Sequence, residues 1–203
     1  MKTEIIDRII QLEWKQFDAV QNEGGRASCQ DDFKTFEIMR KSQFLVWPEK
    51  VLESYEKDVL EAGKKGWNLI SEKYARMMEF TNPAQYENMK DKLPAISEDR
   101  IKMQDQVVEI QVVWMEEFAS SFPRMAGNAR SIRKETDTPY LTSYETYLRG
   151  EISTYSDETF ALYQQFVLEA KANDENIVGE IQENTAHLYG YKSLEDAEAS
   201  LKN

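Results

Sequence analysis

LEAGKKGWNLISE, residues 60–72, returns as LEAKANDENIVGE, residues 168–180. The match extends without a gap from 36–87 to 144–195, at a constant offset of 108 residues. Because the register holds through turns as well as helices, it predicts an internal duplication. The alternative is chance similarity between amphipathic helices, since 108 residues are close to a whole number of 3.6-residue turns.

The first helix of each half also has a counterpart, because IQLEW at 10–14 matches IQVVW at 110–114. Two similar halves usually pack around a pseudo-two-fold axis, so we expect an all-α bundle of two four- to five-helix halves with a shared cleft. The expected parts are a single domain over 1–203, repeat 1 at about 4–89, a connector at 90–96 and repeat 2 at about 97–203.

The composition indicates a folded, acidic protein. The chain has 203 residues, 41% of them hydrophobic, and a formal net charge of −12. That length is enough to bury one sizeable core. A phosphate backbone would be repelled by this charge, so we expect no nucleic-acid partner.

The chain carries a single cysteine, Cys29, which excludes an internal disulfide and is compatible with a reducing compartment. The segment 1–17 lacks the uninterrupted apolar region of a signal peptide. No apolar run approaches the ~20 residues that span a bilayer. We therefore expect a cytoplasmic protein with no membrane association.

Apolar spacing predicts helices throughout. Ile6, Ile10, Trp14 and Phe17 share one helical face, and no alternating strand pattern competes. Asn82-Pro83-Ala84-Gln85 has the pattern of a capping box. The expected helices, eight to ten in all, include segments near 3–21, 33–46, 48–64, 68–80, 142–153, 156–172, 175–188 and 193–202, and one that begins after Ser97.

The loop 22–32 is the first candidate site. Its two glycines let a backbone approach a ligand, and Arg26 could grip a carboxylate or phosphate beside Asn22. Glu23 and Cys29 are weak catalytic candidates, the first as a polar or acid–base group and the second as a thiol near a helix N-terminus. The alternative is that these residues only cap helices and hold the loop in place.

The matching loop of the second half, 124–139, is about eight residues longer and basic. Asn128 and Arg130 are its candidate ligand-binding residues, and the two loops are expected to face one cleft. A solvated loop whose cations pair with nearby acids explains the same pattern.

Charged residues on the later helices could also take part in chemistry. Arg149 is a candidate ligand-binding residue, and Glu79 and Glu151 are weak candidates for proton transfer. Ion pairs on helix surfaces are the commoner use of such residues. A pairing of Cys29 with His187, the only histidine, would depend on the fold.

No metal site is expected, because the chain lacks the two Glu-x-x-His motifs of ferritin-like sites. No nucleotide fingerprint is present either, so the cofactor is unknown. Trp14, Trp47, Trp114, Tyr144 and Tyr155 suit a core built twice. Trp67 breaks the pairing with its counterpart Glu175 and is expected on a cleft wall or a partner surface.

Several segments resemble the bacterial "domain of unknown function 4125" family. They include 22–30, 36–44, 72–79, 127–130, 144–151 and 188–191 and span nearly the whole chain. The resemblance implies a bacterial or archaeal origin, and it brings no activity, substrate or catalytic residue with it.

Two functions remain open from the sequence. The first is binding, with or without turnover, of a small anionic or polar metabolite in a cleft between the halves. The second is a helical adaptor that binds another protein or a second copy of itself without catalysis.

Overall fold

The computed structural model describes residues 2–22 and 24–201, and this part of the chain is all-α. It contains eleven α-helices and three short 3-10 helices, with one isolated bridge between Thr138 and Leu141 in place of any strand. The prediction of an all-α bundle is therefore confirmed. The eleven helices are one more than the upper end of the expected range, and they include two of only five residues, α5 and α7.

The helices of the first part of the chain are α1 (Lys2–Asp18), α2 (Phe33–Val46), α3 (Glu49–Lys64), α4 (Leu69–Thr81) and α5 (Pro83–Glu87). Those of the second part are α6 (Glu98–Ser121), α7 (Pro123–Gly127), α8 (Tyr144–Ile152), α9 (Asp157–Ala172), α10 (Ile177–Leu188) and α11 (Leu194–Ser200). The 3-10 helices are η1 (Ser28–Asp31), η2 (Lys90–Lys92) and η3 (Lys134–Thr136).

Side-chain caps fix where most of the longer helices begin. A cap oxygen accepts a backbone N–H that the first helical turn leaves without a partner, and this stabilises the start of the helix. The capping residues are Asp32 for α2, Asn68 for α4, Asn82 for α5, Ser97 for α6, Ser143 for α8, Ser156 for α9, Asn176 for α10 and Ser193 for α11. These polar residues explain why the predicted helix starts fall within about two residues of the observed ones.

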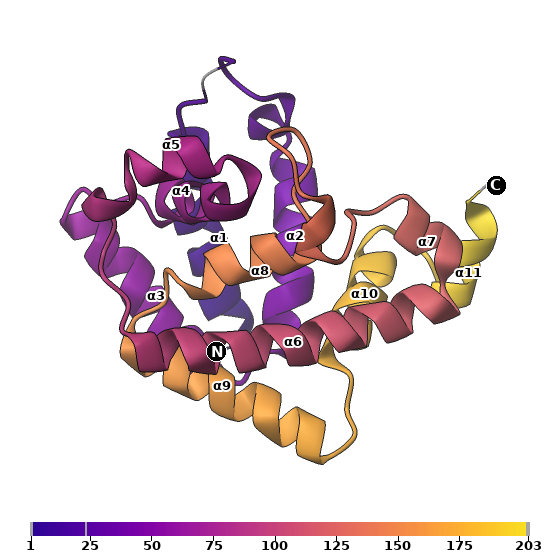
Figure 1. Cartoon of the computed structure of the whole chain (residues 1–203). Helices are drawn as coiled ribbons and strands as arrows, with labels where there is room; N and C mark the ends of the chain where they lie inside the picture. Colours follow the sequence, from indigo (N-terminus) through magenta and orange to yellow (C-terminus); the bar gives the residue numbers. More distant parts are fainter. Residues whose placement is uncertain (1, 23, 202–203) are drawn as a thin grey trace.

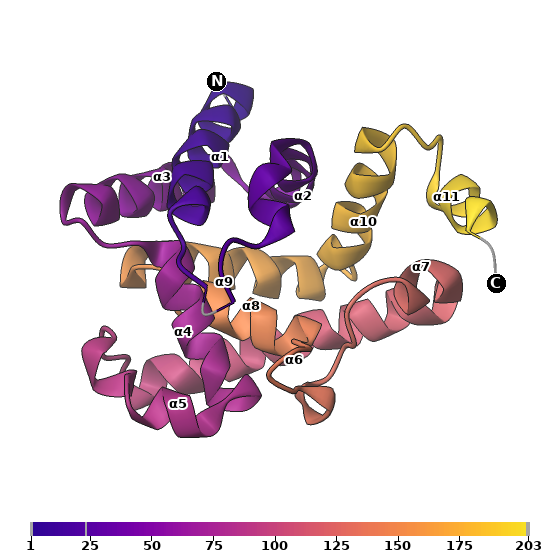
Figure 2. The same cartoon turned by 90° about the horizontal axis from the view of Figure 1, so that it is seen from above.

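The helices wrap around α8, which lies in the middle of the molecule in Figure 1. The long helix α6 runs along one side with α9 beneath it, and α4 and α5 lie on the other side of α8 (Figure 1). Packing joins α4 to α8 and α2 to α10. Seen from above, α7, α10 and α11 form an arm that extends away from α3, α4 and α5 (Figure 2).

The main core contains buried residues from both parts of the chain. Trp47, Tyr163 and Phe44 are among its largest fully buried side chains. Of the aromatic residues expected in the core, Trp47, Trp114 and Tyr155 are buried, whereas Trp14 and Tyr144 are half-buried. The aromatic cluster is therefore where the two parts of the chain meet.

Candidate functional site

A cleft of about 650 Å³ lies between the walls formed by α4–α5 and α6–α8, and the connector after α5 closes one end. Two residues predicted from the sequence, Glu79 and Arg149, line it. Apolar side chains form part of the surface, with Phe80 on α4 and Ile101 on α6. The cleft thus lies between helices of the first part of the chain and helices of the second part.

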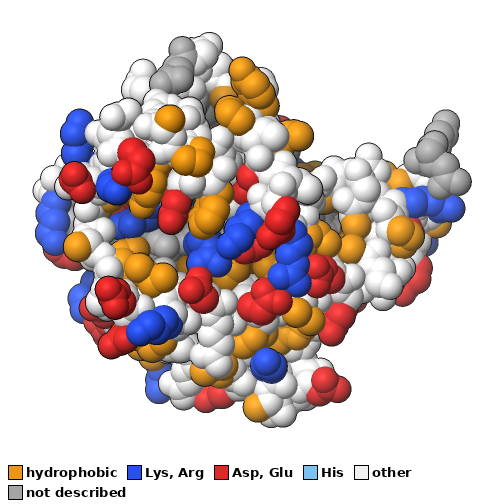
Figure 3. All heavy atoms as spheres, viewed as in Figure 1, with side chains coloured by type: hydrophobic (Ala, Val, Ile, Leu, Met, Phe, Trp, Pro, Cys, Tyr) orange, Lys and Arg blue, Asp and Glu red, His pale blue; other side chains and the backbone are white. Residues whose placement is uncertain are grey.

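The cleft is locally cationic in an acidic protein. Its lining holds four basic side chains, Arg76, Lys90, Lys134 and Arg149, against three acidic ones, Glu79, Asp91 and Asp105. Figure 3 shows Lys and Arg side chains gathered in the middle of this face, with Asp and Glu around them. A local positive excess attracts anions even when the net charge of the protein is negative.

Arg149 has the most distinctive environment of these cations. Its Nη1 donates to Asp105, and its Nη2 lies 3.6 Å from Oε1 of Glu145. Its Nε is buried and has no partner among the described residues. Phe80 lies beneath two cations, with its ring centre 5.8 Å from the Arg149 guanidinium carbon and 5.0 Å from Nζ of Lys134. The arrangement leaves Arg149 with donor capacity that its neighbours do not use.

Glu79 provides an exposed carboxylate at the rim of the same cleft. Tyr86 of α5 lies on the same wall, and burial together with the charge of Glu79 raises the pKa of its phenol. The Tyr86 hydroxyl therefore keeps its proton at neutral pH and can donate a hydrogen bond. Glu79 and Tyr86 give the cleft one proton acceptor and one donor.

Gly150 lets the two walls of the cleft approach closely. A Cβ atom at this position would lie 2.8 Å from Cγ of Met77 and 3.0 Å from the Lys73 carbonyl oxygen. Both distances are too short for ordinary contact, so α8 can pack at this distance from α4 only with glycine here. The contact brings Lys73 of α4 next to Glu151 of α8.

A buried charged network lies behind this contact and joins α1, α2, α4 and α8. Arg40 donates to both oxygens of Glu13 at 2.7 Å and to Glu151 at 3.0 Å. Lys73 donates to the other oxygen of Glu151 at 2.7 Å, and Gln43 donates to Glu151 at 2.9 Å. None of the four charged residues is more than 8% exposed. Two cations and two carboxylates balance one another, as buried charges require.

The network changes the proton affinity of Glu151. Burial alone would raise the pKa of this carboxyl, but the charges of Arg40 and Lys73, with hydrogen bonds from Lys73 and Gln43, hold it well below the usual range. Glu151 is therefore ionised and fully bonded. The structure places it in the core rather than on a cleft wall, away from any ligand in the cleft.

Helix geometry explains why Arg149 and Glu151 separate. The sequence placed them in one set, but residues two apart on a helix point to different faces. Arg149 faces the cleft and is 18% exposed, whereas Glu151 is 4% exposed. Sequence reasoning also missed Arg40, Lys73 and Glu13. One signal was present, because Glu13 lies on the apolar face of α1 between Ile10 and Phe17.

In the first predicted loop, 22–32, the candidate residues hydrogen-bond to neighbouring residues of the chain. Arg26 donates to Asp18 at 2.6 Å, to Asp31 at 2.8 Å and to the Gln30 carbonyl at 2.7 Å, while its side chain remains 46% exposed. Asn22 donates to the buried side chain of Gln30. The donors of Arg26 thus bond to its own loop and to the end of α1, which agrees with the alternative that these residues hold the loop in place. Cys29 is exposed, and Glu23 lies outside the described residues.

The second predicted loop reaches the same end of the molecule. Arg130 donates to the Thr142 carbonyl and lies over the Tyr147 ring, 4.9 Å from its centre. Tyr74 lies within electrostatic range of both loops, because Cys29 of the first loop and Arg130 of the second both influence the pKa of its phenol, which burial raises. The loops therefore lie near each other. Arg26 and Arg130 do not line the cleft described above.

The remaining candidate residues have local partners. Asn128 donates to the Arg124 carbonyl 2.8 Å away, within its own short helix turn. His187 contacts the Lys192 carbonyl at 3.1 Å. In the residues that the structure describes, no group of three His, Cys, Asp or Glu side chains could hold a metal ion. Within the same part of the chain, no helix is both long enough and apolar enough to cross a membrane.

Comparison with known proteins gives one match. No curated protein and no solved structure matches the chain. A family model described as "Protein of unknown function (DUF4125)" matches residues 3–199, nearly the whole of the 203-residue chain. This confirms the resemblance inferred from the sequence motifs, and the chain belongs to this family.

Proposed function

We propose that the protein binds a small anionic or polar metabolite in the cleft between α4–α5 and α6–α8. The observation that carries the proposal is the unpartnered buried Nε of Arg149 in a cleft with more basic than acidic side chains. An arginine with an unused donor suits a carboxylate or phosphate oxygen. A volume of about 650 Å³ suits a metabolite-sized ligand.

Other residues support the same cleft. Lys134 and Arg76 add positive charge, and Phe80 offers an apolar surface between two cations. Any turnover in the cleft would use Glu79 as proton acceptor and Tyr86 as donor. The proposal names a binding cleft and leaves the reaction open.

A thermal-shift screen with citrate, inorganic phosphate and glucose 6-phosphate tests the proposal. A ligand at 100 times its Kd adds about 2.7 kcal/mol of stability, which raises the Tm of a protein of this size by about 5–10 °C. Arg149→Gln should lose the shift. Arg8→Gln, which removes an exposed cation that does not line the cleft, should keep it. If Arg149→Gln retains the full shift for every hit, the cleft is not the binding site.

We also infer that the two halves arose by duplication, and crossed packing supports this. α4 packs on α8 and α10 on α2, as a two-fold exchange of matching helices would give. Gln43 donates to Glu151, its counterpart 108 residues later. The Trp47 ring lies 5.2 Å from that of Tyr163, and the Tyr55 ring lies 5.2 Å from that of Tyr155. At the offset of 108 residues, Trp47 corresponds to Tyr155 and Tyr55 to Tyr163. The two ring contacts are therefore exchanged when the two halves are exchanged.

If the halves are duplicated, two hydrogen bonds refine the alignment of α1, the first helix of one half, with α6, the first helix of the other. Tyr55 donates to Glu13, whereas its counterpart Tyr163 donates to Gln111. This pairs α1 with α6 at an offset of 98 rather than 100. Superposition of residues 36–87 on 144–195 tests the duplication, because unrelated helices would not align together with their connecting turns.

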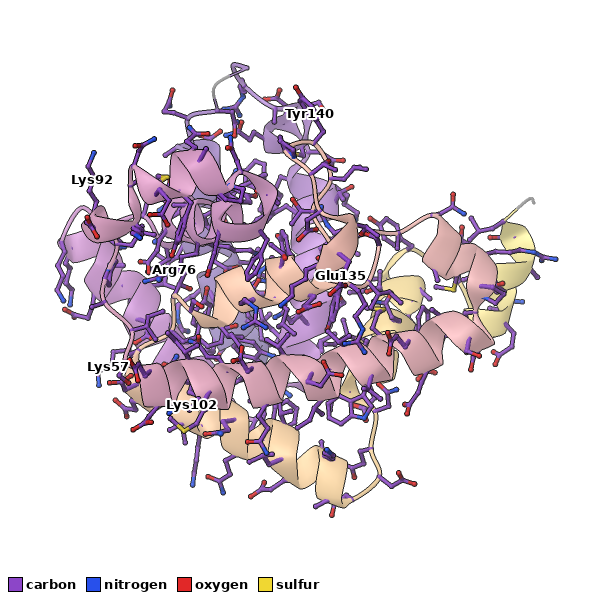
Figure 4. The ribbon with its side chains drawn as sticks, viewed as in Figure 1. Lys57, Arg76, Lys92, Lys102, Glu135 and Tyr140 are labelled. Carbon is purple, nitrogen blue, oxygen red and sulfur yellow. The ribbon has the colours of Figure 1, made fainter. Side chains whose placement is uncertain are left out.

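The adaptor function remains a second candidate because of one surface feature. Tyr140 is 93% exposed and Leu141 is 64% exposed at the tip of the loop before α8. Figure 4 places Tyr140 at the edge of the molecule, away from the cleft residue Arg76. Tyr140→Ser with Leu141→Ser should abolish self-association in analytical ultracentrifugation if the tip binds a second copy. A monomeric wild-type protein would remove that form of the adaptor.

A further inference from the structure

The indole ring of Trp67 is partly exposed and differs from those of Trp14 and Trp47 in its packing. It is 38% exposed and lies on the wall of a second cleft of about 690 Å³, on the other side of the connector. Among the described residues, no other aromatic ring and no cation packs on its indole. Trp14 and Trp47, in contrast, each contact several rings. The structure thus places this tryptophan on a cleft wall, one of the two locations expected from the sequence.

One buried carboxylate fixes both Trp67 and a neighbouring arginine. Glu72 is 4% exposed; its Oε2 accepts from the Trp67 indole at 2.5 Å, and its Oε1 accepts from Arg76 Nε at 2.8 Å. Arg76 Nη2 also donates to the Pro94 carbonyl at 2.7 Å. Arg76 Nη1 has no partner among the described residues. The ring and the free donor are therefore neighbours, each held in place by Glu72.

The cleft lining carries both signs of charge. Asp58 and Glu61 lie on the face of α3 that lines the cleft beside Trp67, and Lys65 follows on the same face. Arg100 lines the cleft too; it is 6% exposed, and its Nε is buried without a partner among the described residues. One part of the cleft thus offers carboxylates and an aromatic ring, and another offers guanidinium donors.

We propose that this second cleft binds a small zwitterion, in which a substituted ammonium group is joined to a carboxylate by a short spacer. The ammonium group lies on the Trp67 face near Asp58 and Glu61, because a cation over an indole ring is attracted to its π system. The carboxylate accepts from Arg76 Nη1, with Arg100 as the second guanidinium. This cleft adjoins the cleft around Arg149, and both are lined by Arg76, Pro94, Ala95, Ile96 and Ser153. Trp67, Asp58, Glu61 and Arg100 line only the second cleft, and Arg149 lines only the first.

Two isosteric probes test the proposal on the full chain. Glycine betaine and 3,3-dimethylbutyrate have the same shape and carboxylate, but only betaine carries the positive nitrogen. The readout is the indole Nε1–H signal of Trp67 in ¹⁵N-labelled protein, which is identified as the signal absent from Trp67→Phe. Betaine should shift this signal in a saturable way and leave the other three tryptophan signals in place.

Charge variants locate the two ends of the ligand. Asp58→Asn keeps an oxygen that can accept from the Ser156 amide and should weaken betaine binding about fivefold, the effect of one charge at about 4 Å in water. Asp7→Asn removes an exposed acid outside the cleft and should change nothing. Arg149→Gln should also leave betaine binding unchanged, which separates this site from the anion cleft.

Three results would overturn the proposal. The first is no shift of the Trp67 signal with betaine at about 10 mM, ten times the concentration that half-fills a site of 1 mM Kd. The second is an equal shift with 3,3-dimethylbutyrate, which would show that the positive nitrogen is not recognised. The third is betaine binding that survives Asp58→Asn and Glu61→Gln together without loss.

Discussion

Replacing Glu151 by glutamine tests the buried network most directly. The substitution keeps the shape and one acceptor oxygen but removes one of two buried negative charges. The positive charges of Arg40 and Lys73 would then be balanced by a single carboxylate, that of Glu13. Among the described residues, this carboxylate accepts hydrogen bonds from Arg40 and Tyr55 but not from Lys73. Breaking a buried ion pair by neutralising one partner costs about 3–5 kcal/mol. We expect Glu151→Gln to lose that much of its free energy of unfolding.

A double-mutant cycle distinguishes the loss of a charge from general damage to the core. Lys73→Met removes the cation and keeps an unbranched chain in its place. The double variant has a balanced pair again, Arg40 with Glu13, so its loss should be clearly smaller than the sum of the two single losses. Urea unfolding followed by linear extrapolation measures all four proteins. A loss below about 1 kcal/mol for Glu151→Gln, or strict additivity, would refute the network as a source of stability.

The same variant has a predictable pH dependence. The folded-state pKa of Glu151 lies below its ordinary value of about 4.3. Its contribution is therefore fully present above pH of about 4.3 and is lost as the pH falls towards the folded pKa. The stability difference between wild type and Glu151→Gln should shrink as the pH falls from about 5 to 3. A difference that stays constant over this range would show that Glu151 is not held ionised by Arg40 and Lys73.

Three further predictions concern packing, cooperativity and the first loop. Gly150→Ala should cost about 1–3 kcal/mol in urea unfolding, because its Cβ would press on Met77 and on the Lys73 carbonyl; wild-type stability would contradict the close approach of α4 and α8. Unfolding followed by far-UV circular dichroism and by tryptophan fluorescence should give one coincident transition, because one core cluster draws on both halves; two separated transitions would indicate two independent units. Arg26→Gln should change the free energy of unfolding by less than about 1 kcal/mol, because its ion pairs are exposed, yet limited proteolysis near Gly24 and Gly25 should accelerate; an unchanged cleavage rate would mean that Arg26 does not hold the loop.

Local signals made the helices predictable. Asn68, Ser97 and Ser156 each stand immediately before a helix and cap it through the side chain, so the sequence marks the boundary directly. Apolar spacing then identifies the buried face. The short helices α5 and α7 were harder, because a five-residue helix contains little more than one turn of periodicity. The residues of α7 after Pro123 accordingly fall within the loop predicted at 124–139.

The candidate site was predictable only in part, because its geometry depends on contacts between distant residues. Arg149 and Glu79 were found because they are charged and lie on helices. Nothing in the local sequence shows that Glu151 is in the core, since its partner Lys73 is 78 residues away and Arg40 is 111 residues away. Arg26 illustrates the opposite case: its partners Asp18 and Asp31 lie within eight residues, and the sequence offered local bonding within the loop as an alternative to ligand binding.

The buried network and the candidate cleft are two sides of one contact. Gly150 lines the cleft, and Glu151, the next residue, bonds to Lys73 on the facing helix. The spacing of α4 and α8, and with it the position of Phe80 and Arg149 on opposite walls, therefore depends on the ion pair behind them. Glu151→Gln should weaken binding in the cleft although Glu151 touches no ligand there, whereas the double variant with Lys73→Met, which restores charge balance, should recover part of the affinity. Equal ligand affinity in wild type and Glu151→Gln, measured below the unfolding range, would mean that α4 and α8 are held in place by apolar packing alone.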